Sequence, residues 1–331
     1  MTNIAFLGCA HIHTPGFLKL IKSRGDVMLK TVWDHDAPRG QKYADDAGAR
    51  FIGDVNTILH DPEISAVVVC SETERHHDLV LPIAQAKKHL FVEKPLGFAS
   101  QDGYAMADAI EKAGVKFQTG YFMRGLPIHL FLKEQVEKGL FGRITRVRGS
   151  NCHAGALRGW FDTDYRWMAD PKIAGCGAFG DLGTHSLDIL LWIFGEITSA
   201  TGALAKGTAR YENCEETGEA LLKFKSGVLG TLAAAWDDVA NPVTLQISGT
   251  EAFASVINGE LFLTSKSLDC DGKTPWTKLP PAKPAGFEAF LDAITGKEAK
   301  LVTPREAAYR SAVMEAIYDG AKHNNWETPK V

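Results

Sequence analysis

The sequence predicts an α/β protein with a doubly wound parallel sheet in its N-terminal part. An α+β region built on a mostly antiparallel open sheet is expected to follow. In the first ~120 residues, short apolar runs alternate with helical patterns of about 10–15 residues, which is typical of βαβ units. Residues 66–70 are wholly apolar and rich in Val, as in a parallel strand that is covered on both faces. After residue 121, segments of alternating polarity follow one another between turn signals such as Asn258-Gly259, which indicates antiparallel hairpins.

The N-terminal part is expected to alternate strands and helices throughout. Gly48 and Gly114 each follow a helical pattern, and we interpret them as the stops at which two of the helices end. The expected strands are residues 4–7, 27–33, 50–52, 66–70, 89–92 and 116–120. The expected helices are residues 14–22, 39–47, 55–59, 77–86 and 101–113.

The pattern changes after residue 121, where we place the boundary between two domains, 1–121 and 122–331. A chain of 331 residues favours two domains, because single hydrophobic cores stop growing near ~250 residues. The expected strands of the second part are residues 219–224, 228–236, 243–249, 251–257 and 260–263. Its expected helices are residues 128–138, 179–194, 286–294 and 303–324.

Composition excludes several classes of partner. The net charge of −4 gives no electrostatic reason to expect nucleic acid or an anionic membrane surface. No apolar run reaches the ~20 residues that a membrane span needs, and the first residues lack the features of a signal peptide. The cysteines form no CxxC pair and no metal-ligand spacing, so we expect free thiols in a reducing compartment and a cytoplasmic protein. They are Cys9, Cys70, Cys152, Cys176, Cys214 and Cys270.

Glu93-Lys94-Pro95 follows the apolar strand 89–92 directly. The carboxyl end of a parallel strand borders the crevice in which α/β sheets bind their ligands. Pro95 biases Lys94 toward extended backbone, because the residue before a proline is restricted. The sequence therefore places a Lys side chain at the expected ligand crevice.

The turn after the first strand is a partial match to the dinucleotide-binding fingerprint. The fingerprint needs Gly at positions 8, 10 and 13, or Ala at the third, whereas this chain has Gly8, Ala10 and His13. Gly8 permits a tight turn, and Ala10 is small enough for a pyrophosphate to approach. The amides of Ala10, His11 and Ile12 are expected to face the phosphates at a helix N-terminus.

Asp34 ends the second strand, where an acidic side chain accepts hydrogen bonds from a ribose 2′-hydroxyl and repels a 2′-phosphate. This position favours NAD over NADP. The alternative is that Asp34 has only a structural role, in a turn or as a helix cap.

His11-x-His13 also permits a second interpretation. Two His one residue apart on a strand point to the same face and can share a metal ion, as in barrel hydrolases. A barrel needs repeated βα units throughout, whereas the second part of this chain has an antiparallel pattern. Our main interpretation therefore assigns no metal ion.

A second cluster of chemically active residues begins in the glycine-rich run 175–183. If this segment is helical, Asp181 and His185 stand at i and i+4 and share one face, and Asp188 lies on the same side. A carboxylate beside an imidazole fixes its orientation and tunes its pKa. The alternative is a structural Asp–His pair.

Together these motifs resemble the glucose–fructose oxidoreductase / inositol dehydrogenase (Gfo/Idh/MocA) family over nearly the whole chain. The most specific parts are Glu93-Lys94-Pro95 and the run from Gly175 through Asp181 and His185 to Asp188. Supporting matches are residues 71–76, 120–124 and 165–167. The departures are Ala10 and His13 in the phosphate loop, and Cys176 where the family often has Gly.

The resemblance implies an N-terminal Rossmann domain, a C-terminal α+β domain, and reversible hydride transfer between a nicotinamide and a sugar or cyclitol carbon. It makes Lys94, Asp181 and His185 the catalytic set. The implied cofactor-binding residues are Gly8, Ala10, His11, Ile12, Asp34, Ser71, Glu72, His76, Glu93, Lys94 and Arg166. The implied substrate-binding residues are Lys94, Tyr121, Arg124, His153, Trp160, Asp181, His185 and Trp236.

In this interpretation His185 takes the hydroxyl proton, Lys94 stabilises the developing alkoxide, and Asp181 orients His185 or binds a neighbouring hydroxyl. The expected cofactor is NAD, with NADP less favoured, and the expected partner is a small sugar or polyol. The family also implies a homodimer or homotetramer formed through the C-terminal sheet. Two alternatives stay open: a non-catalytic NAD-binding sensor of the same fold, and a metal-dependent hydrolase that uses His11 and His13.

Overall fold

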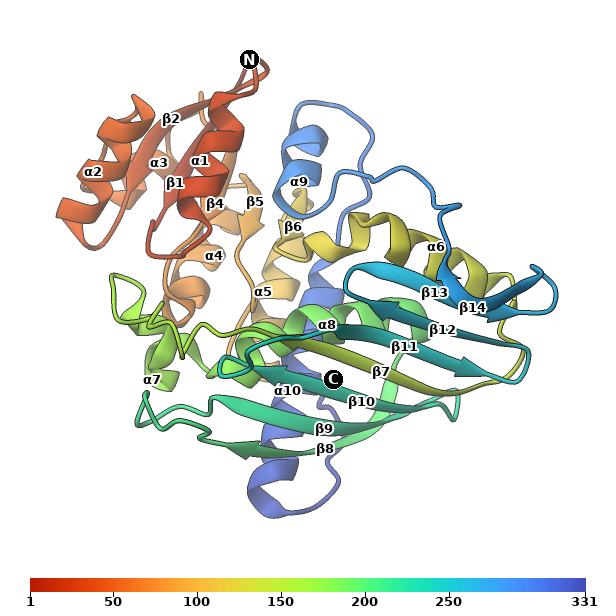
Figure 1. Ribbon diagram of the computed structural model, residues 1–331. Helices are drawn as coiled ribbons and strands as arrows, with labels where there is room; N and C mark the ends of the chain where they lie inside the picture. Colours follow the sequence, from red (N-terminus) through yellow and green to blue (C-terminus); the bar gives the residue numbers. More distant parts are fainter.

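The computed structural model describes residues 1–331 and contains two sheets, each with its own helices (Figure 1). The first sheet has six strands in the order β3-β2-β1-β4-β5-β6, and all neighbouring strands run parallel. Its strands are β1 (Thr2–Leu7), β2 (Val27–Trp33), β3 (Arg50–Phe51), β4 (Ala66–Val69), β5 (His89–Val92) and β6 (Phe117–Thr119). The predicted doubly wound parallel sheet is confirmed.

Helices cover both faces of this sheet, because alternate side chains of each strand point to opposite sides. On one face α3, α4 and α5 pack against buried side chains such as Leu7 and Val67. On the other face α1, α2 and α9 pack against Ile4 and Phe6. These helices are α1 (Thr14–Lys22), α2 (Ala37–Ala47), α3 (Val55–Leu59), α4 (His76–Gln85), α5 (Ser100–Ala113) and α9 (Gly286–Ile294).

Helix α9 comes from the C-terminal part of the chain and returns to the N-terminal sheet. Phe287 and Phe290 pack against Phe91 of β5, with ring centroids 5.0 Å and 5.8 Å from it. The hydrophobic pattern alone predicted this helix but not the sheet that it covers. The boundary after residue 121 stays a prediction.

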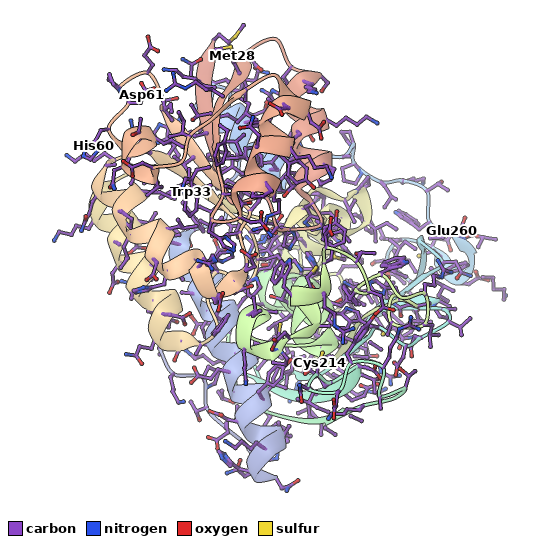
Figure 2. The ribbon with its side chains drawn as sticks, turned by 90° about the vertical axis from the view of Figure 1, so that its left-hand side faces the viewer. Met28, Trp33, His60, Asp61, Cys214 and Glu260 are labelled. Atoms are coloured by element: carbon purple, nitrogen blue, oxygen red, sulfur yellow. The ribbon has the colours of Figure 1, made fainter.

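The strand order reverses between β1 and β4, and at such a point an α/β sheet opens a crevice outside the carboxyl ends of its strands. In Figure 2, Met28 lies at the top of the molecule, and Trp33, at the other end of β2, lies toward the second domain. The carboxyl ends of the parallel strands therefore face the second domain, and a ligand in the crevice would lie between the two.

The second sheet has eight strands in the order β14-β13-β12-β11-β7-β10-β9-β8. Only the β7–β10 pair is parallel, so the predicted mostly antiparallel sheet is confirmed. The strands are β7 (Ile144–Cys152), β8 (Ile197–Ala205), β9 (Thr217–Phe224), β10 (Leu229–Ala235), β11 (Val243–Gly249), β12 (Ala252–Ile257), β13 (Glu260–Ser265) and β14 (Cys270–Pro275).

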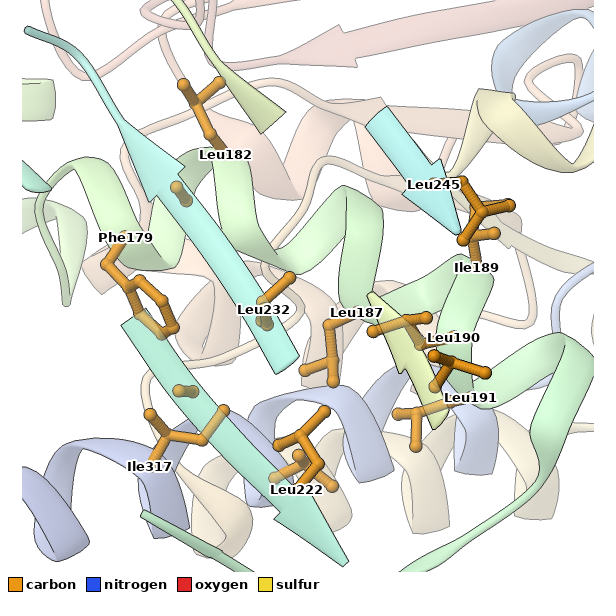
Figure 3. Packing of buried hydrophobic residues seen from close by; sticks show 14 of the residues in the cluster. Phe179, Leu182, Leu187, Ile189, Leu190, Leu191, Leu222, Leu232, Leu245 and Ile317 are labelled. Carbon is orange, nitrogen blue, oxygen red and sulfur yellow. The ribbon is translucent and has the colours of Figure 1, made fainter. Parts of the chain in front are cut away.

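Helix α8 (Ala178–Phe194) lies across the inner face of this sheet and forms the centre of its core. Figure 3 shows Leu187 and Leu190 of α8 among side chains of the sheet, such as Leu222 and Leu232. Almost all of α8 is buried, so the residues that it carries are held by packing on every side. The other helical segments are η1 (Thr73–Arg75), η2 (Phe122–Gly125), α6 (Pro127–Glu137), η3 (Arg166–Ala169), α7 (Pro171–Ala174) and α10 (Pro304–His323).

The structure confirms the expected helices to within two residues at their ends, and it confirms the hairpin turn at Asn258-Gly259. Both turn residues have positive φ, 51° and 81°, and the flanking residues Ile257 and Glu260 pair across β12 and β13. Strands β7, β8 and β14 are absent from the expected strands. The sequences of β8 and β14 lack a regular alternation of apolar and polar residues. None of the helices has the length and apolar character that would let it cross a membrane.

Candidate active site

Lys94 links the parallel sheet to helix α8. It follows β5, its peptide bond to Pro95 is cis, and its side chain is 3% exposed. The Nζ atom donates to Asp181 Oδ1 at 2.5 Å and to the Asp181 carbonyl oxygen at 3.2 Å. Burial opposes the charge on Lys94, but Asp181 and Glu93 outweigh it and raise the pKa of the ammonium above its usual range. Lys94 is therefore a fixed buried cation.

Asp181 lies in the first turn of α8 and holds Lys94 from the second domain. Its other oxygen, Oδ2, accepts a hydrogen bond from Trp236 Nε1 at 3.1 Å. Burial would raise the pKa of this carboxyl, but the ammonium of Lys94 lowers it to about 2. Asp181 is thus a carboxylate with a donor on each oxygen.

His185 lies one turn further along α8, as the spacing predicted, and it is buried. No hydrogen bond joins it to Asp181, and its Nδ1 atom has no partner in the protein. The rings of Phe122 and Tyr121 lie 5.4 Å and 6.4 Å from the imidazole. Burial, together with the charge of Lys94, lowers the pKa of His185 to about 3. The imidazole is therefore neutral, and its Nδ1 atom is free to form a hydrogen bond.

The first βα turn has the geometry of a phosphate-binding loop. Gly8 has φ +84°, and a Cβ at this position would lie 2.5 Å from the Cβ of Ser71, so only Gly fits. The amide of His11 donates to the carbonyl of Cys70, whereas the amides of Ala10 and Ile12 donate to no protein acceptor. Two of the three predicted amides are thus free to bind an anion, and α1 begins just after them.

Two family models match the chain. The model described as the oxidoreductase family with an NAD-binding Rossmann fold matches residues 2–121, and the model of the GFO/IDH/MocA C-terminal domain matches residues 129–255. The chain belongs to the Gfo/Idh/MocA family. The resemblance predicted from the two motifs is confirmed, and the phosphate-binding loop described above lies within the NAD-binding domain of this family.

Relatives of known name include dehydrogenases of sugars and cyclitols. A myo-inositol 2-dehydrogenase from Thermotoga maritima is 31% identical over 223 residues, or 64% of this chain. A levoglucosan dehydrogenase from Pseudarthrobacter phenanthrenivorans is 26% identical over 247 residues, or 65% of this chain. In each case the matched segment spans 62% of the relative's length.

Solved structures share the fold over the full chain. A levoglucosan dehydrogenase in complex with NADH and levoglucosan has a TM-score of 0.83 and 20% sequence identity. The alignment covers 99% of this chain and 100% of that one. This likeness confirms the expected fold class, a Rossmann-like parallel sheet followed by a second, mostly antiparallel sheet.

Within the Rossmann domain, the carboxylate of Asp34 already has hydrogen-bond partners from the protein. Its carboxylate accepts hydrogen bonds from the amides of Cys9 and Asp36 and two more from the guanidinium of Arg39. Arg39 also donates to Glu72 at 3.1 Å. The side chain of Asp34 is fully buried, whereas that of Arg39 is 20% exposed. Arg39, which sequence reasoning did not single out, is therefore the more exposed residue of this pair.

Two further predicted cofactor residues, His76 and Ser71, contact the turns that carry Lys94 and Gly8. His76 Nδ1 lies 3.1 Å from the carbonyl of Pro95, so it braces the turn that carries Lys94. Ser71 packs against Gly8, and its hydroxyl donates to the carbonyl of Glu72. Their contact with the cofactor stays a prediction.

Glu93 is fully buried behind Lys94 and accepts its backbone amide at 2.9 Å. The second carboxylate oxygen lies 2.9 Å from Nδ1 of His13, a residue that sequence reasoning treated as a misfit in the fingerprint and, in the alternative interpretation, as a metal ligand together with His11. Burial opposes ionisation of Glu93, but His11, His13 and Lys94 outweigh it and hold its pKa below the usual range. The carboxylate therefore stays charged at the base of the phosphate loop.

Two predicted substrate residues, Tyr121 and Trp236, are almost fully buried. The hydroxyl of Tyr121 lies 3.0 Å from Thr184 Oγ1, and Trp236 packs on Phe161 while its indole N–H donates to Asp181. In this structure both side chains position neighbouring residues. Their contact with a substrate stays a prediction.

Arg124 and Asp188 form a buried ion-pair network behind the site. Arg124 donates two hydrogen bonds to Asp188, at 2.9 Å and 2.6 Å, and a third to Glu306 of α10. Arg310 donates to the same Asp188 carboxylate at 2.9 Å. These ion pairs connect η2, α8 and α10, so Arg124 helps to hold these three elements together. Its predicted contact with substrate stays a prediction.

The segment 153–167 carries the more accessible predicted residues. His153 and Trp160 lie side by side with ring centroids 4.7 Å apart, and Trp160 is 40% exposed. Arg166 is directed onto Asp162 and the ring of Tyr211, and its predicted contact with the cofactor stays a prediction. The sequence missed the neighbouring Trp167, whose indole N–H donates to the carbonyl of Ala10 at 3.1 Å. Trp167 is the last residue of the 165–167 motif, and only this place in the motif could have indicated that it reaches the phosphate loop.

Proposed function

We propose that this protein is an NAD(H)-dependent dehydrogenase or reductase that acts on a hydroxyl-bearing carbon of a sugar, glycoside or cyclitol. The Lys94–Asp181 pair carries the proposal, because it joins the Rossmann crevice to the second domain with His185 one turn away. Membership of the oxidoreductase family and the named sugar and cyclitol dehydrogenases among the relatives support it. The nicotinamide, when bound, supplies or accepts the hydride.

Lys94 is suited to hold the substrate oxygen. An ammonium has three N–H donors, and Asp181 occupies two of them through its carboxylate and its carbonyl. The third is free to donate to the oxygen that gains negative charge as hydride leaves the same carbon. Asp181 keeps the ammonium charged and fixed, and Trp236 in turn fixes Asp181.

His185 is suited to take the hydroxyl proton. Its imidazole is neutral, and its Nδ1 atom is buried without a protein partner, so a substrate hydroxyl would satisfy an atom that is otherwise left without a hydrogen bond. The exposed ring of Trp160 beside His153 offers a sugar an apolar face next to a polar group. We assign residues 1–121 to the cofactor domain and 122–331 to the substrate domain, with α9 returning to the former.

The test is the formation of NADH by the purified full-length protein with NAD or NADP and a panel of monosaccharides, glycosides, sugar acids and inositols. A substrate-dependent signal that disappears in Lys94→Ala supports the proposal. Silence across the panel, with NAD binding measured by calorimetry, would favour the non-catalytic sensor. Silence without NAD binding would contradict the proposal.

We further propose that two copies pair through the open face of the eight-stranded sheet. Leu221 and Leu229 are 51% and 55% exposed on adjacent strands of this face, and Trp326 is 41% exposed. Arg148 and Glu219 lie exposed on the same sheet, so a two-fold arrangement can bring opposite charges together. Light scattering should give a dimer or tetramer mass, and Leu221→Glu should reduce it; a wild-type monomer would contradict the pairing.

We also propose a cytoplasmic location. All six cysteines are free thiols in the structure, which is the state that a reducing compartment maintains. Fractionation of the source cells with an antibody to the protein tests this, and recovery in an extracellular fraction would contradict it.

A further inference from the structure

A second cluster of ionisable side chains lies beside the Lys94–Asp181 pair. His11 and His13 follow β1, whereas Glu93 follows β5, 80 positions after His13. The parallel sheet brings the two segments together, because both strands end at the same edge. Sequence reasoning paired the two His only with each other, and the tertiary structure adds the carboxylate.

The three side chains converge on one point. Glu93 Oε1 lies 2.9 Å from His13 Nδ1 and 3.9 Å from His11 Nδ1. One ligating atom from each residue lies within 4.8 Å of the other two. The second oxygen of Glu93 accepts the amide of Lys94, and this hydrogen bond holds the carboxylate in place. The cluster thus has one fixed anionic oxygen with two imidazole nitrogens near it, and His11 Nδ1 also accepts the amide of His13 at 3.3 Å, a hydrogen bond that a bound ion would replace.

We propose that His11, His13 and Glu93 form a binding site for one divalent transition-metal ion of the zinc class. Two imidazoles and a carboxylate are a donor set that suits zinc, and three protein ligands leave a coordination position open. The inference is independent of the proposed hydride transfer, since it concerns metal binding by the free protein.

The distances suit such an ion. Tetrahedral coordination with bonds of about 2.1 Å places neighbouring ligand atoms about 3.4 Å apart. The two Nδ1–Oε1 distances, 2.9 Å and 3.9 Å, lie on either side of that value. The two imidazole nitrogens lie within 4.8 Å of each other, so a closer approach of the rings, by about 1 Å, would seat an ion between the three atoms.

The ion would be reached from the crevice. The side chains of Glu93 and His11 are 0% and 3% exposed, whereas that of His13 is 37% exposed. The open coordination position therefore lies on the His13 side, next to the free amides of Ala10 and Ile12. A ligand oxygen such as a phosphate or hydroxyl oxygen would complete the coordination there.

The experiment uses full-length protein that has been treated with a chelator and then freed of it. Zn²⁺ is titrated by calorimetry, and Co²⁺ is titrated by absorbance, because the Co²⁺ spectrum distinguishes nitrogen and oxygen ligands from cysteine thiolates. We expect one ion per chain in the wild type and a spectrum without a thiolate charge-transfer band.

Two ligand variants are compared with a matched control. His13→Asn and Glu93→Gln should each weaken binding at least tenfold, since each removes one ligand. His323→Asn serves as the control, because His323 also lies near a carboxylate, with Nδ1 3.6 Å from Glu327 Oε1, but on α10. Circular dichroism verifies folding, and His13→Asn remains informative if Glu93→Gln fails to fold, because His13 is partly exposed.

Two results would overturn the site. One is the absence of stoichiometric Zn²⁺ or Co²⁺ uptake by folded wild-type protein at micromolar free metal. The other is uptake that is the same in the wild type, His13→Asn and His323→Asn, which would place the ion on other groups such as the cysteines.

Discussion

Lys94 and His185 are both buried near Asp181, but their charge states are opposite. Lys94 lies at the end of a strand and is paired with Asp181, so its pKa is raised and it stays a cation. His185 lies inside a buried helix with no partner on Nδ1, so burial lowers its pKa to about 3 and it stays neutral. Similar burial therefore gives a charged donor in one place and a neutral acceptor in the other.

The difference shows that the presence of a charge partner, and not burial alone, sets the state of each group. Asp181 illustrates this, because its carboxylate neutralises Lys94 but makes no hydrogen bond to His185, four residues further along the helix. A cation and a neutral base side by side are what oxidation of a hydroxyl needs, since one group stabilises the alkoxide and the other takes the proton.

Removal of the cation should have the largest effect. Lys94→Ala is expected to lower kcat by about 10³-fold or more, because it removes the donor that stabilises the alkoxide. Affinity for NAD, measured by calorimetry, should stay within a few-fold. Lys112→Ala, on the exposed side of α5, is the control. Turnover near that of the wild type in Lys94→Ala would refute the role of this residue.

The neutral state of His185 should appear as a pH dependence of stability. Its pKa is about 3 in the folded protein, whereas an imidazole in the unfolded chain titrates near ~6.5. Between these values only the unfolded chain binds the proton, so the free energy of unfolding falls as the pH falls below ~6.5. The expected contribution of His185 is a loss of about 2 kcal/mol by pH ~5.

His185→Gln should remove this part of the pH dependence. Urea unfolding near neutral pH and near pH ~5 measures it, and the quantity compared is the difference between the two free energies of unfolding. The control, His323→Gln, changes an exposed His and should retain the wild-type difference. An unchanged difference in His185→Gln would show that the folded protein binds a proton there.

Asp34 and Arg39 provide a test of the cofactor end of the crevice. Asp34→Ala should raise the preference for NADP over NAD by about tenfold, because it removes an acid and releases Arg39 to bind a 2′-phosphate. The ratio of kcat/KM for the two cofactors measures this. Adding Arg39→Ala should abolish the gain. If the gain persists in the double variant, another residue binds the phosphate.

Trp236→Phe should have the smallest effect on turnover. It distinguishes the packing of the Trp236 ring from the positioning of Asp181 by its N–H group. It keeps a ring against Phe161 but removes the N–H that donates to Asp181. We expect kcat to fall by about tenfold or less with KM nearly unchanged, because Lys94 still holds the carboxylate. Trp326→Phe, in the segment after α10 that packs on Lys223 of β9, should leave both constants unchanged. An increase in KM alone would indicate a direct contact of Trp236 with substrate.

The motifs of the sequence are local, and this explains which parts of the site they revealed. Lys94 directly follows a strand, and Asp181 and His185 share one helical face, so their positions follow from the periods of strand and helix. The sequence did not reveal the roles of Arg39 and Trp167. The loop between β2 and α2 must fold before Arg39 can contact Asp34, and Trp167 contacts Ala10 from 157 positions further along the chain.

By itself, the sequence determined the helices, the strands of the first sheet and most of those of the second, the parallel and antiparallel character of the two parts, and the family. These depend on hydrophobic periodicity and on turn residues, which act over a few neighbouring positions. The tertiary structure decided that α9 covers the N-terminal sheet, that Asp181 pairs with Lys94 while His185 keeps a free nitrogen, and that Glu93 meets His11 and His13. Those contacts join residues far apart in the chain, and only the packing of two sheets and their helices brings them together.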